Sequence, residues 1–298
     1  MTRRLANPRG IGPTLPSSVK AAVTFARSAW WRVTTRDEPA TGGLRILFYH
    51  RVSDDHDPLA VPRRRFREQI DFLASEGYSV VDVAAAVDLL DAGEIPPKTI
   101  GLNFDDGYLD TAEEALPLVE GHGFRATVFV PTAVIDGDVS FPWYRRQPPL
   151  LTWDDIVDLD RGGTLRFEAH SLTHPNLLSV DDELAEREIE GSKLALETRL
   201  ERTVEAFCYP AGLFGERERR LAAAAGYRFA VSCEPGVNVG TTERFALRRR
   251  QIDAHDRLID FRAKVCGGHD SPLPFRNHYR RLRYGEGSRK PMRASSAR

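Results

Sequence analysis

The sequence predicts an α/β protein in which seven or eight parallel strands form a (β/α) barrel within a single domain. After the Gly42-Gly43 break, short β-rich runs alternate with longer segments of helical period, as in a parallel sheet with crossover helices. Seven or eight such repeats in about 225 residues fit a closed or nearly closed barrel better than an open sheet of that many strands. A doubly wound sheet is the alternative.

The strands are taken from apolar runs that are bounded by turn residues. They are expected, in order, at residues 44–50 (LRILFYH), 79–82, 99–104 (TIGLNF), 126–130 (ATVFV), 165–169 (LRFEA), 204–209 (VEAFCY), 228–232 and 245–249. The helices are taken from the intervening segments of helical period. They are expected at residues 63–76, 83–92, 111–122, 153–161, 181–201, 216–226 and 256–266.

Basic segments flank the predicted barrel. Residues 1–36 contain 7 Lys and Arg and no acid, and residues 275–298 contain 8 against the single Glu286. Residues 37–274 contain 27 basic and 42 acidic residues, and this acidic body argues against a nucleic-acid enzyme with a basic channel. The predicted divisions of the chain are a basic extension at 1–43, the barrel at 44–268 and a basic tail at 269–298.

The extension contains an apolar segment, SSVKAAVTFARSAWWRV. Lys20, Arg27 and Arg32 interrupt it too often for a signal-peptide core or a membrane span. As a helix it would turn its apolar residues toward one side, and these are Val19, Val23, Phe25, Ala26, Trp30 and Trp31. Such a helix docks on the body or lies on a membrane, and the basic ends would favour contact with an anionic membrane surface.

The three cysteines give information about the cellular compartment in which the protein works. Cys208, Cys233 and Cys266 are widely spaced and outside any Cys-x-x-Cys pattern, so neither a disulfide framework nor a zinc finger is indicated. Together with the interrupted apolar segment, they lead us to expect a cytoplasmic protein, with any membrane contact at the inner face.

Polar residues gather where the predicted strands end, which is where (β/α) barrels place their chemistry. These groups are Tyr49-His50-Arg51 after the first strand, Asp105-Asp106-Gly107 after the third, the segment 170–174 after the fifth, and Tyr209-Pro210-Ala211-Gly212 after the sixth. Neighbouring aspartates before a glycine are also common in turns. Their convergence with two histidines on one rim favours a functional site.

His170 and His174 are four residues apart, so both imidazoles reach one side if the chain turns helically after the strand. Two histidines and one carboxylate give three ligands and an open position, as in a catalytic divalent-metal site. A metal in such a site lowers the pKa of water from about 16 to about 7, which makes water a sufficient nucleophile for a carbonyl carbon. A second carboxylate could take the remaining proton, and a backbone N–H in the loop after the sixth strand could hold the oxyanion.

Three motifs in order, NFDDG at 103–107, HSLTH at 170–174 and CYPAG at 208–212, resemble the polysaccharide deacetylase family with the NodB homology domain. The segments GYLDTAEEALPLVEGHGFRATVFV and LTWDDI are similar to that family too. The resemblance covers roughly residues 44–268. It implies a distorted (β/α) barrel that removes acetyl groups from amino sugars with one divalent metal ion, usually zinc. It also implies an acetylated glycan or glycolipid as substrate, such as a surface-polysaccharide or exopolysaccharide precursor.

The resemblance also implies roles for individual residues. Asp105 matches the family's catalytic base, and the metal ligands are matched by Asp106, His170 and His174. Ala211 stands where the family commonly has a tyrosine whose backbone N–H faces the oxyanion. A backbone role survives that replacement.

The chain departs from the family at two places. Cys208 stands where many members have an arginine that orients the catalytic aspartate, and the late Leu-x-His motif, whose histidine serves as general acid, is not evident. The segment ALRRR at 246–250 resembles instead a branch found among exopolysaccharide and surface-glycan enzymes. Arg249, or else Arg248, could replace the missing arginine from a different strand.

The missing acid has two candidates. His50 ends the first strand within YHRV, which is also a feature of that branch, and it could equally be a buried structural histidine. His269 in GGHD follows a predicted helix rather than a strand, so it is the weaker candidate. The remaining histidines are expected at the surface, and they are His56, His122, His255 and His278.

These patterns favour a metal-dependent glycan deacetylase. A metal hydrolase of another amide or of an ester is the second interpretation, and a noncatalytic carbohydrate-binding relative is the third, although sugar binding alone needs no open metal site. Trp143, Tyr144 and Trp153 lie in or beside a long insertion at 131–152, where they could stack on sugar rings or pack the loop against the body.

Overall fold

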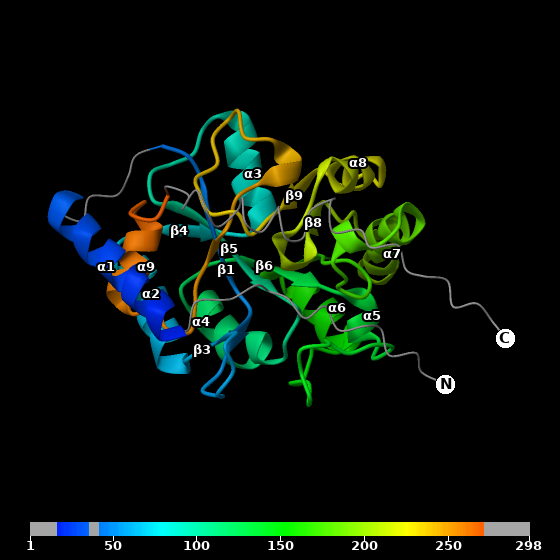
Figure 1. The fold of residues 1–298 in the computed structure, drawn as a ribbon, viewed down its shortest axis with the longest axis horizontal. Coiled ribbons are helices and arrows are strands. Elements are labelled where there is room, and N and C mark those ends of the chain that lie inside the picture. The colour runs from blue at the N-terminus through cyan, green and yellow to red at the C-terminus, as the bar shows by residue number, and fades with distance from the viewer. Residues whose placement is uncertain (1–16, 36–41, 271–298) are drawn as a thin grey trace.

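The computed structural model describes residues 17–35 and 42–270, and it shows strands and helices alternating along the chain (Figure 1). The strands of its main sheet are β1 (Arg45–Tyr49), β4 (Ser79–Val81), β5 (Thr99–Asp105), β6 (Ala126–Val130), β7 (Leu165–Ala169), β8 (Ala206–Cys208), β9 (Phe229–Val231) and β10 (Arg250–Gln251). All their pairings are parallel, in the order β10-β1-β5-β6-β7-β8-β9, with β4 beside β5. The predicted fold class is confirmed.

The sheet curls until its two ends meet. β9 forms a parallel bridge with Leu247, and the chain then continues into β10, which pairs with β1. The predicted strand at 245–249 is therefore wrong in its placement. Residues Arg244–Ala246 form a 3-10 turn, η4, because the Glu243 carboxylate accepts the main-chain N–H of Phe245 (2.8 Å) and starts the turn. This split last strand makes the barrel a distorted one.

Helices cover the outside of the curled sheet. They are α1 (Ser17–Thr35), α2 (Arg63–Ser75), α3 (Val83–Ala92), α4 (Leu116–Gly121), α5 (Thr132–Ile135), α6 (Trp153–Gly162), α7 (Asp182–Leu200), α8 (Glu216–Ala224) and α9 (Leu258–Val265). Several begin at a side-chain cap: Asp82, Thr152 and Asp181 each accept a main-chain N–H three residues further on. The structure adds a small parallel sheet that the sequence analysis missed, formed by β2 (Arg51–Val52) and β3 (Ala60–Val61).

One predicted helix begins irregularly. Residues Thr111–Ala115 form a π-helical turn, η1, before α4. Pro117 has no N–H to donate to the carbonyl four residues earlier, and the main-chain N–H of Leu116 reaches back to Thr111 instead. The wider turn accommodates this proline within an otherwise helical segment.

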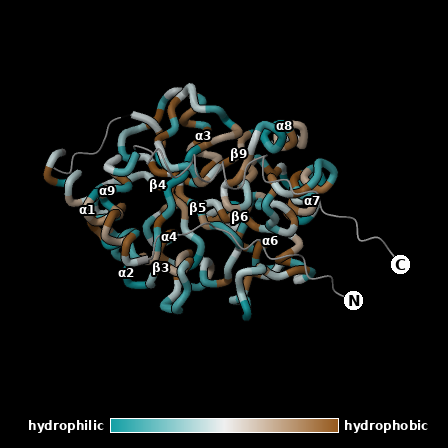
Figure 2. Tube along the Cα trace, in the orientation of Figure 1, coloured by the Kyte–Doolittle hydropathy of each residue, from teal (hydrophilic) through white to brown (hydrophobic). Residues whose placement is uncertain are grey.

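Strand residues alternate between an outer and an inner cluster, and apolar segments fill the centre of the trace (Figure 2). The outer cluster packs under the helices and includes Phe104 and Phe207, whereas the inner cluster includes Phe129 and Cys208. Because successive side chains of a strand point to opposite faces, Asp105 must point inward if Phe104 points outward. The strand period thus directs Asp105 and Cys208 into the same interior.

The described part of the basic extension forms α1, which packs against α9 (Figure 1). Trp31 is buried in the outer cluster, and the buried Ser28 hydroxyl lies 3.1 Å from His269 Nε2. Trp30 is 72% exposed, so the two tryptophans do not share the one apolar side that was predicted. Within the described ranges, no helix is long and apolar enough to cross a membrane.

A carboxylate joins β7 to β8, where the strands share only one pair of residues, Ala169 and Phe207. Glu168 is 1% exposed, and its Oε2 atom accepts the main-chain N–H groups of Glu205 (2.8 Å) and Ala206 (2.7 Å). Arg202 donates to Oε1 at 3.2 Å. The side chain thus supplies the bonds that a longer strand pair would have made.

We predict that Glu168→Ala lowers the free energy of unfolding by roughly 3 kcal/mol, because it leaves two buried main-chain donors without their acceptor and removes one partner of Arg202. Urea unfolding followed by circular dichroism measures this change. Glu190→Ala, at an exposed position of α7, is the control and should stay within about 0.5 kcal/mol of the parent chain. Equal stability of the two variants would contradict the role given to Glu168.

Candidate metal and catalytic site

A carboxylate and two histidines meet at the carboxyl ends of β5 and β7. Asp106 directly follows β5, and His170 directly follows β7. The Asp106 Oδ1 atom lies 3.7 Å from the Nε2 atoms of both His170 and His174, and the imidazole centroids are 4.6 Å apart. The three predicted metal ligands therefore lie together, with their ligand atoms within 4.8 Å of one another.

The segment between the two histidines does not turn helically, which corrects the prediction for it. Ser171 and His174 have φ values of 66° and 57°, in the left-handed region, and the chain between them is an irregular loop. The Ser171 hydroxyl accepts the main-chain N–H of His174 at 3.0 Å. Left-handed residues, rather than one face of a helix, bring the two imidazoles together.

A buried glutamate of α7 holds this loop in place. The Glu188 Oε2 atom accepts the main-chain N–H groups of Leu172 (2.9 Å) and Thr173 (2.8 Å), and Oε1 accepts the Thr173 hydroxyl (2.5 Å). At Gly191 of the same helix, a Cβ would lie only 2.9 Å from the Leu172 side chain. The sequence analysis missed Glu188, although a charged residue at a core-facing position of a predicted helix was a signal that could have identified it.

The surroundings of the three side chains suit a divalent cation. Asp106 Oδ1 is buried and accepts no hydrogen bond from the described residues. Burial and the neighbouring charge of Asp105 raise the pKa of Asp106 well above its usual range, so a cation beside this carboxylate would relieve an unfavourable charge. Burial lowers the pKa of His170 to about 4 and that of His174 well below its usual value, so both rings are neutral and can offer a nitrogen. His170 Nδ1 donates to the Cys208 carbonyl (2.7 Å), which leaves the unprotonated Nε2 able to bind a cation.

The second aspartate is held by a buried arginine. Arg249 is fully buried, and its two terminal nitrogens donate to the Oδ1 and Oδ2 atoms of Asp105 at 2.7 and 3.0 Å. Asn103 Nδ2, two residues earlier on β5, donates to Oδ1 at 3.0 Å. Burial alone would raise the pKa of Asp105, but the charge and hydrogen bonds of Arg249 lower it overall, so this side chain is a carboxylate at neutral pH. Arg248 is turned away, and its guanidinium reaches the Val237 carbonyl at 3.5 Å.

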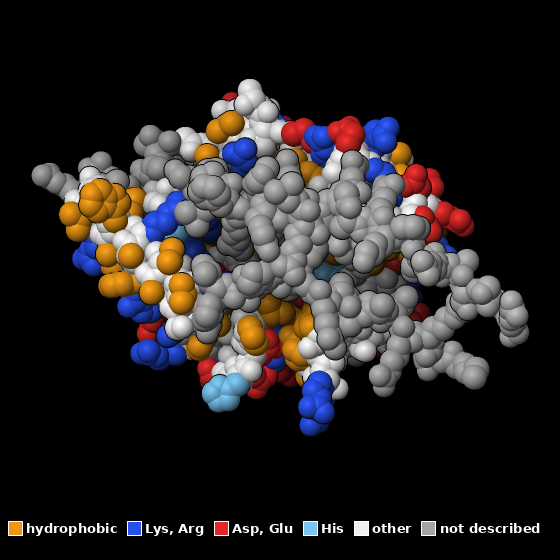
Figure 3. All heavy atoms as spheres, viewed as in Figure 1, with side chains coloured by type: hydrophobic (Ala, Val, Ile, Leu, Met, Phe, Trp, Pro, Cys, Tyr) orange, Lys and Arg blue, Asp and Glu red, His pale blue; other side chains and the backbone are white. Residues whose placement is uncertain are grey.

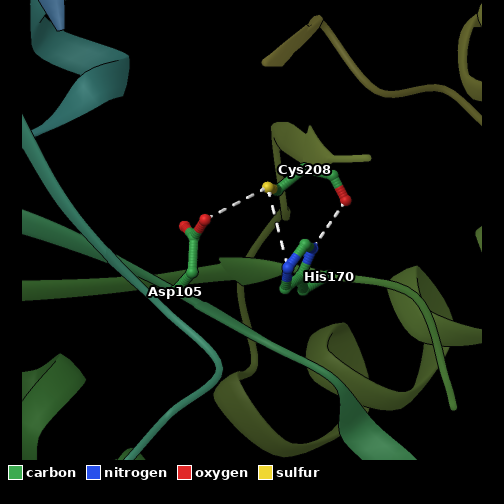
Figure 4. A group of neighbouring side chains, drawn as sticks. All are labelled: Asp105, His170 and Cys208. Carbon is green, nitrogen blue, oxygen red and sulfur yellow. Dashed lines mark hydrogen bonds between the residues drawn. The ribbon is translucent and has the colours of Figure 1, made fainter. Parts of the chain in front are cut away.

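Figure 4 shows a second group of possible ligands that shares His170. Cys208 Sγ lies 3.9 Å from Asp105 Oδ2 and 3.9 Å from His170 Nε2. Arg249 donates to Asp105 and, at 3.0 Å, to this sulfur, so a metal here would face a fixed positive charge. Burial also raises the pKa of Cys208, which keeps the thiol protonated. The group of Asp106 and the two histidines is therefore the better metal site.

A third group of possible ligands lies beside α9. It consists of Asp253, His255 and Asp256. The Lys264 ammonium lies 3.2 Å from Asp253 Oδ2 and also donates to Asp256, so a lysine already neutralises these carboxylates. We assign no metal to this group.

The third motif forms a tight turn next to the site. Ala211, within η3 (Pro210–Gly212), has a φ of 54° and is exposed. At Gly212, whose φ is 64°, a Cβ would lie 2.4 Å from the main-chain nitrogen of Cys233, so only glycine fits. The turn thus presents the main chain of Ala211 at the surface of the rim.

The two candidate acids lie in different places. His50 follows β1 on the same rim, half-buried, with its ring 5.7 Å from that of Phe48. Burial lowers the pKa of His50, and the charge of Asp105 opposes this shift, which places the two side chains within electrostatic reach. His269 instead lies buried under α1, with its Nε2 atom 3.1 Å from the Ser28 hydroxyl, and it lines a pocket together with Cys233 and Arg249. His50 is thus the candidate that the structure brings to the site.

The loop that follows α5 brings an aromatic ring beside the candidate metal ligands. Trp143 is 44% exposed, stacks on Phe141 (4.5 Å, 21°) and meets the ring of His174 at 5.1 Å. Tyr144 is engaged elsewhere, since its hydroxyl donates to Asp57 at 2.6 Å. Trp153 is also engaged elsewhere, since its Nε1 donates to the Asp136 carboxylate at 2.6 Å. Of the three aromatic residues named from the sequence, Trp143 offers an accessible ring beside the site.

Comparison with known proteins finds a family and several relatives that this chain resembles. The family model described as "Polysaccharide deacetylase" matches residues 92–230. The Bacillus subtilis protein YxkH is 26% identical over 226 residues, which cover 76% of this chain and 75% of YxkH. The poly-beta-1,6-N-acetyl-D-glucosamine N-deacetylase of Staphylococcus aureus is 20% identical over 224 residues, which cover 72% of this chain and 76% of that protein.

A solved structure shares the fold. The Streptococcus pyogenes deacetylase PplD, determined with acetate, superimposes with a TM-score of 0.66 at 20% sequence identity. The match covers 76% of this chain and 99% of that one. At this identity the likeness supports the fold, whereas the arrangement of the site rests on the contacts described above.

We predict that Glu188→Ala weakens zinc binding by about 10- to 100-fold, because the loop that carries His174 loses its anchor. Isothermal titration with zinc measures the affinity, and circular dichroism checks that the chain is folded. Glu186→Ala, at an exposed position of the same helix, is the matched control and should bind zinc as the parent does. Unchanged affinity in a folded Glu188→Ala protein would show that the loop needs no support from α7.

Proposed function

Because the chain belongs to the polysaccharide deacetylase family, we propose that it is a metal-dependent hydrolase that removes acetyl groups from an N-acetylated sugar. The single observation that carries this proposal is the position of an arginine-held carboxylate, Asp105, directly beside the group formed by Asp106, His170 and His174. The substrate we propose is a surface-polysaccharide or exopolysaccharide precursor, free or linked to lipid. The N-acetylglucosamine polymer named for the Staphylococcus aureus relative supports this class.

In the proposed site, Asp106, His170 and His174 would hold one divalent ion. Two imidazoles and a carboxylate are ligands that zinc favours, although cobalt or nickel could replace it. When bound, such an ion supplies a lowered water pKa and polarisation of a carbonyl group. The chain itself contributes neutral rings, an unpartnered carboxylate oxygen and a loop held by Glu188.

Asp105 would take the proton of the attacking water. Its low pKa keeps it ionised and ready to accept, and Arg249 and Asn103 fix its orientation from two sides. Arg249 would thus do from the segment before β10 what the arginine absent at Cys208 does in other members of the family. A noncatalytic sugar-binding protein would need neither this buried ion pair nor the adjacent metal ligands.

Two further groups would complete the reaction. The main-chain N–H of Ala211, presented by the left-handed turn, would donate to the oxyanion that forms on the acetyl carbonyl. His50, which follows β1, would protonate the departing amine from its imidazolium form, which burial disfavours and the charge of Asp105 favours. Both assignments use groups that follow strands of the curled sheet, β8 for Ala211 and β1 for His50.

Trp143 would bind the sugar ring next to the reacting acetamido group. One face of its indole is stacked on Phe141, and 44% of the side chain is exposed, so a second surface is free for a pyranose ring. The hydrogen bond from Tyr144 to Asp57 fixes the neighbouring part of the loop, which keeps the indole in place before substrate arrives.

We predict that His174→Ala loses both bound zinc and acetate release, whereas Asp105→Asn keeps zinc and loses turnover by about 10²-fold or more. Metal analysis after dialysis and acetate release from a panel of N- and O-acetylated oligosaccharides measure both properties. His56→Ala, which removes an exposed histidine, is the control. If Asp105→Asn lost zinc as His174→Ala does, the roles of the two aspartates would be reversed. Acetate release from O-acetylated sugars or simple esters alone would support an esterase instead.

We predict that Trp143→Ala raises KM for an acetylated oligosaccharide by roughly tenfold and leaves hydrolysis of a small acetyl ester unchanged, because only the larger substrate reaches the indole. Trp143→Phe should restore most of the affinity. Steady-state kinetics with both substrates separates this effect from damage to the reacting centre. Trp30→Ala removes another exposed indole, far from the site, and should leave both substrates unaffected.

A further inference from the structure

Helix α1 presents apolar side chains on two opposite faces. The face turned to the barrel carries Trp31 and Ser28, both buried, and the guanidinium of Arg257 covers Phe25 at 3.9 Å. The opposite face carries a stripe of exposed residues at helical spacing, which we call the outer stripe: Val19, Val23, Ala26, Trp30 and Val33. Helix α1 therefore packs on the barrel through its narrower apolar face, and the outer stripe, which has more apolar residues, faces solvent.

The outer stripe is unusual for this molecule. Five of the eight large hydrophobic side chains that are exposed in the described part of the chain belong to α1. Trp30 and Val33 are 72% and 79% exposed. Figure 3 shows hydrophobic side chains, in orange, gathered on the left of the molecule, where Figure 1 places α1. The other three lie apart on the loop, α7 and the segment before η4, and they are Trp143, Leu194 and Val239. A contiguous exposed patch of this kind indicates a binding surface.

The charges around the outer stripe indicate the kind of partner. Lys20 is exposed on α1 near the stripe, Arg32 is exposed on the same helix, and residues 1–36 contain no acidic side chain. The barrel, in contrast, is acidic over 37–274. Long cationic side chains beside a row of Val and Trp are the pattern of a helix that lies in a membrane interface, with its cations at the level of anionic headgroups.

A second copy of the chain fits this surface less well. A twofold contact would place one outer stripe on the other and bring the cations of the two α1 helices together. In a head-to-tail contact, the stripe would need an apolar patch elsewhere on the partner, and the remaining exposed hydrophobic side chains among the described residues are scattered. An anionic lipid surface satisfies both the apolar stripe and the cations.

We propose that the outer stripe of α1 docks on an anionic lipid surface while the inner face of the helix stays packed on α9 through Trp31. The 19-residue helix would lie in the plane of the interface, with its long axis, about 28 Å, along the surface. This binding does not depend on the reaction proposed above. Its consequence is that the barrel is held at the membrane, where a lipid-linked glycan would be presented to it.

Cosedimentation of the full chain with vesicles tests the proposal. Phosphatidylcholine vesicles with and without phosphatidylglycerol, at low and high salt, give the partition coefficient. We expect binding that requires the anionic lipid and weakens with salt, and a loss of about tenfold or more in the double variant Trp30→Ser with Val33→Ser. Leu194→Ser, which removes an exposed leucine from α7, is the matched control and should bind as the parent does.

The remaining outcomes are equally decisive. Tryptophan emission should shift to the blue when the parent chain binds vesicles and lose most of this shift in Trp30→Phe, because Trp30 is the indole that would enter the interface. No binding to anionic vesicles, or binding that the double variant retains in full, would overturn the proposal. Vesicle-independent dimers that the double variant abolishes would assign the outer stripe to a second copy. Acetate release from a water-soluble oligosaccharide should be unchanged in the double variant, which separates this test from that of the proposed reaction.

Discussion

The ion pair between Arg249 and Asp105 is the interaction around which the rest of the structure is organised. A fully buried guanidinium is costly unless its donors are satisfied, and here the Asp105 carboxylate and the Ser232 carbonyl accept from it, while the rings of Phe48 and Phe129 flank it. The arginine belongs to the segment that closes the barrel between β9 and β1. The segment that closes the barrel therefore also supplies the arginine that orients the proposed base, Asp105.

This ion pair also separates the two neighbouring aspartates chemically. Asp105 has a guanidinium on both oxygens, so its pKa is low despite burial, whereas Asp106 faces burial and the charge of Asp105, so its pKa is high. Adjacent carboxylates whose environments oppose each other are suited to different tasks. One remains available to a proton, and the other gains most from a cation.

The site is also where the backbone is least relaxed. Among the described residues, six other than glycine have positive φ, and four of these lie in the motifs of the site: Asp106, Ser171, His174 and Ala211. Such conformations persist only where surrounding contacts hold them. Glu188 does so for the histidine loop, and the close approach of Gly212 to Cys233 does so for the turn of Ala211. The rigid barrel thus supports the loops on which the chemistry depends.

The sequence by itself determined the fold class, the strands of the main sheet except the last, and the motifs whose polar residues meet on one rim, because these follow from local periodicity and turn residues. It also identified Arg249 and Arg248 as alternatives. Only the folded barrel decided between them, because neighbouring residues of the segment before β10 point to opposite sides and Arg249 is the one that points inward to Asp105. Glu188, the split last strand and the outward stripe of α1 were likewise decided by tertiary packing. Each depends on which partner lies opposite a residue in space, and the order of residues along the chain does not contain that information.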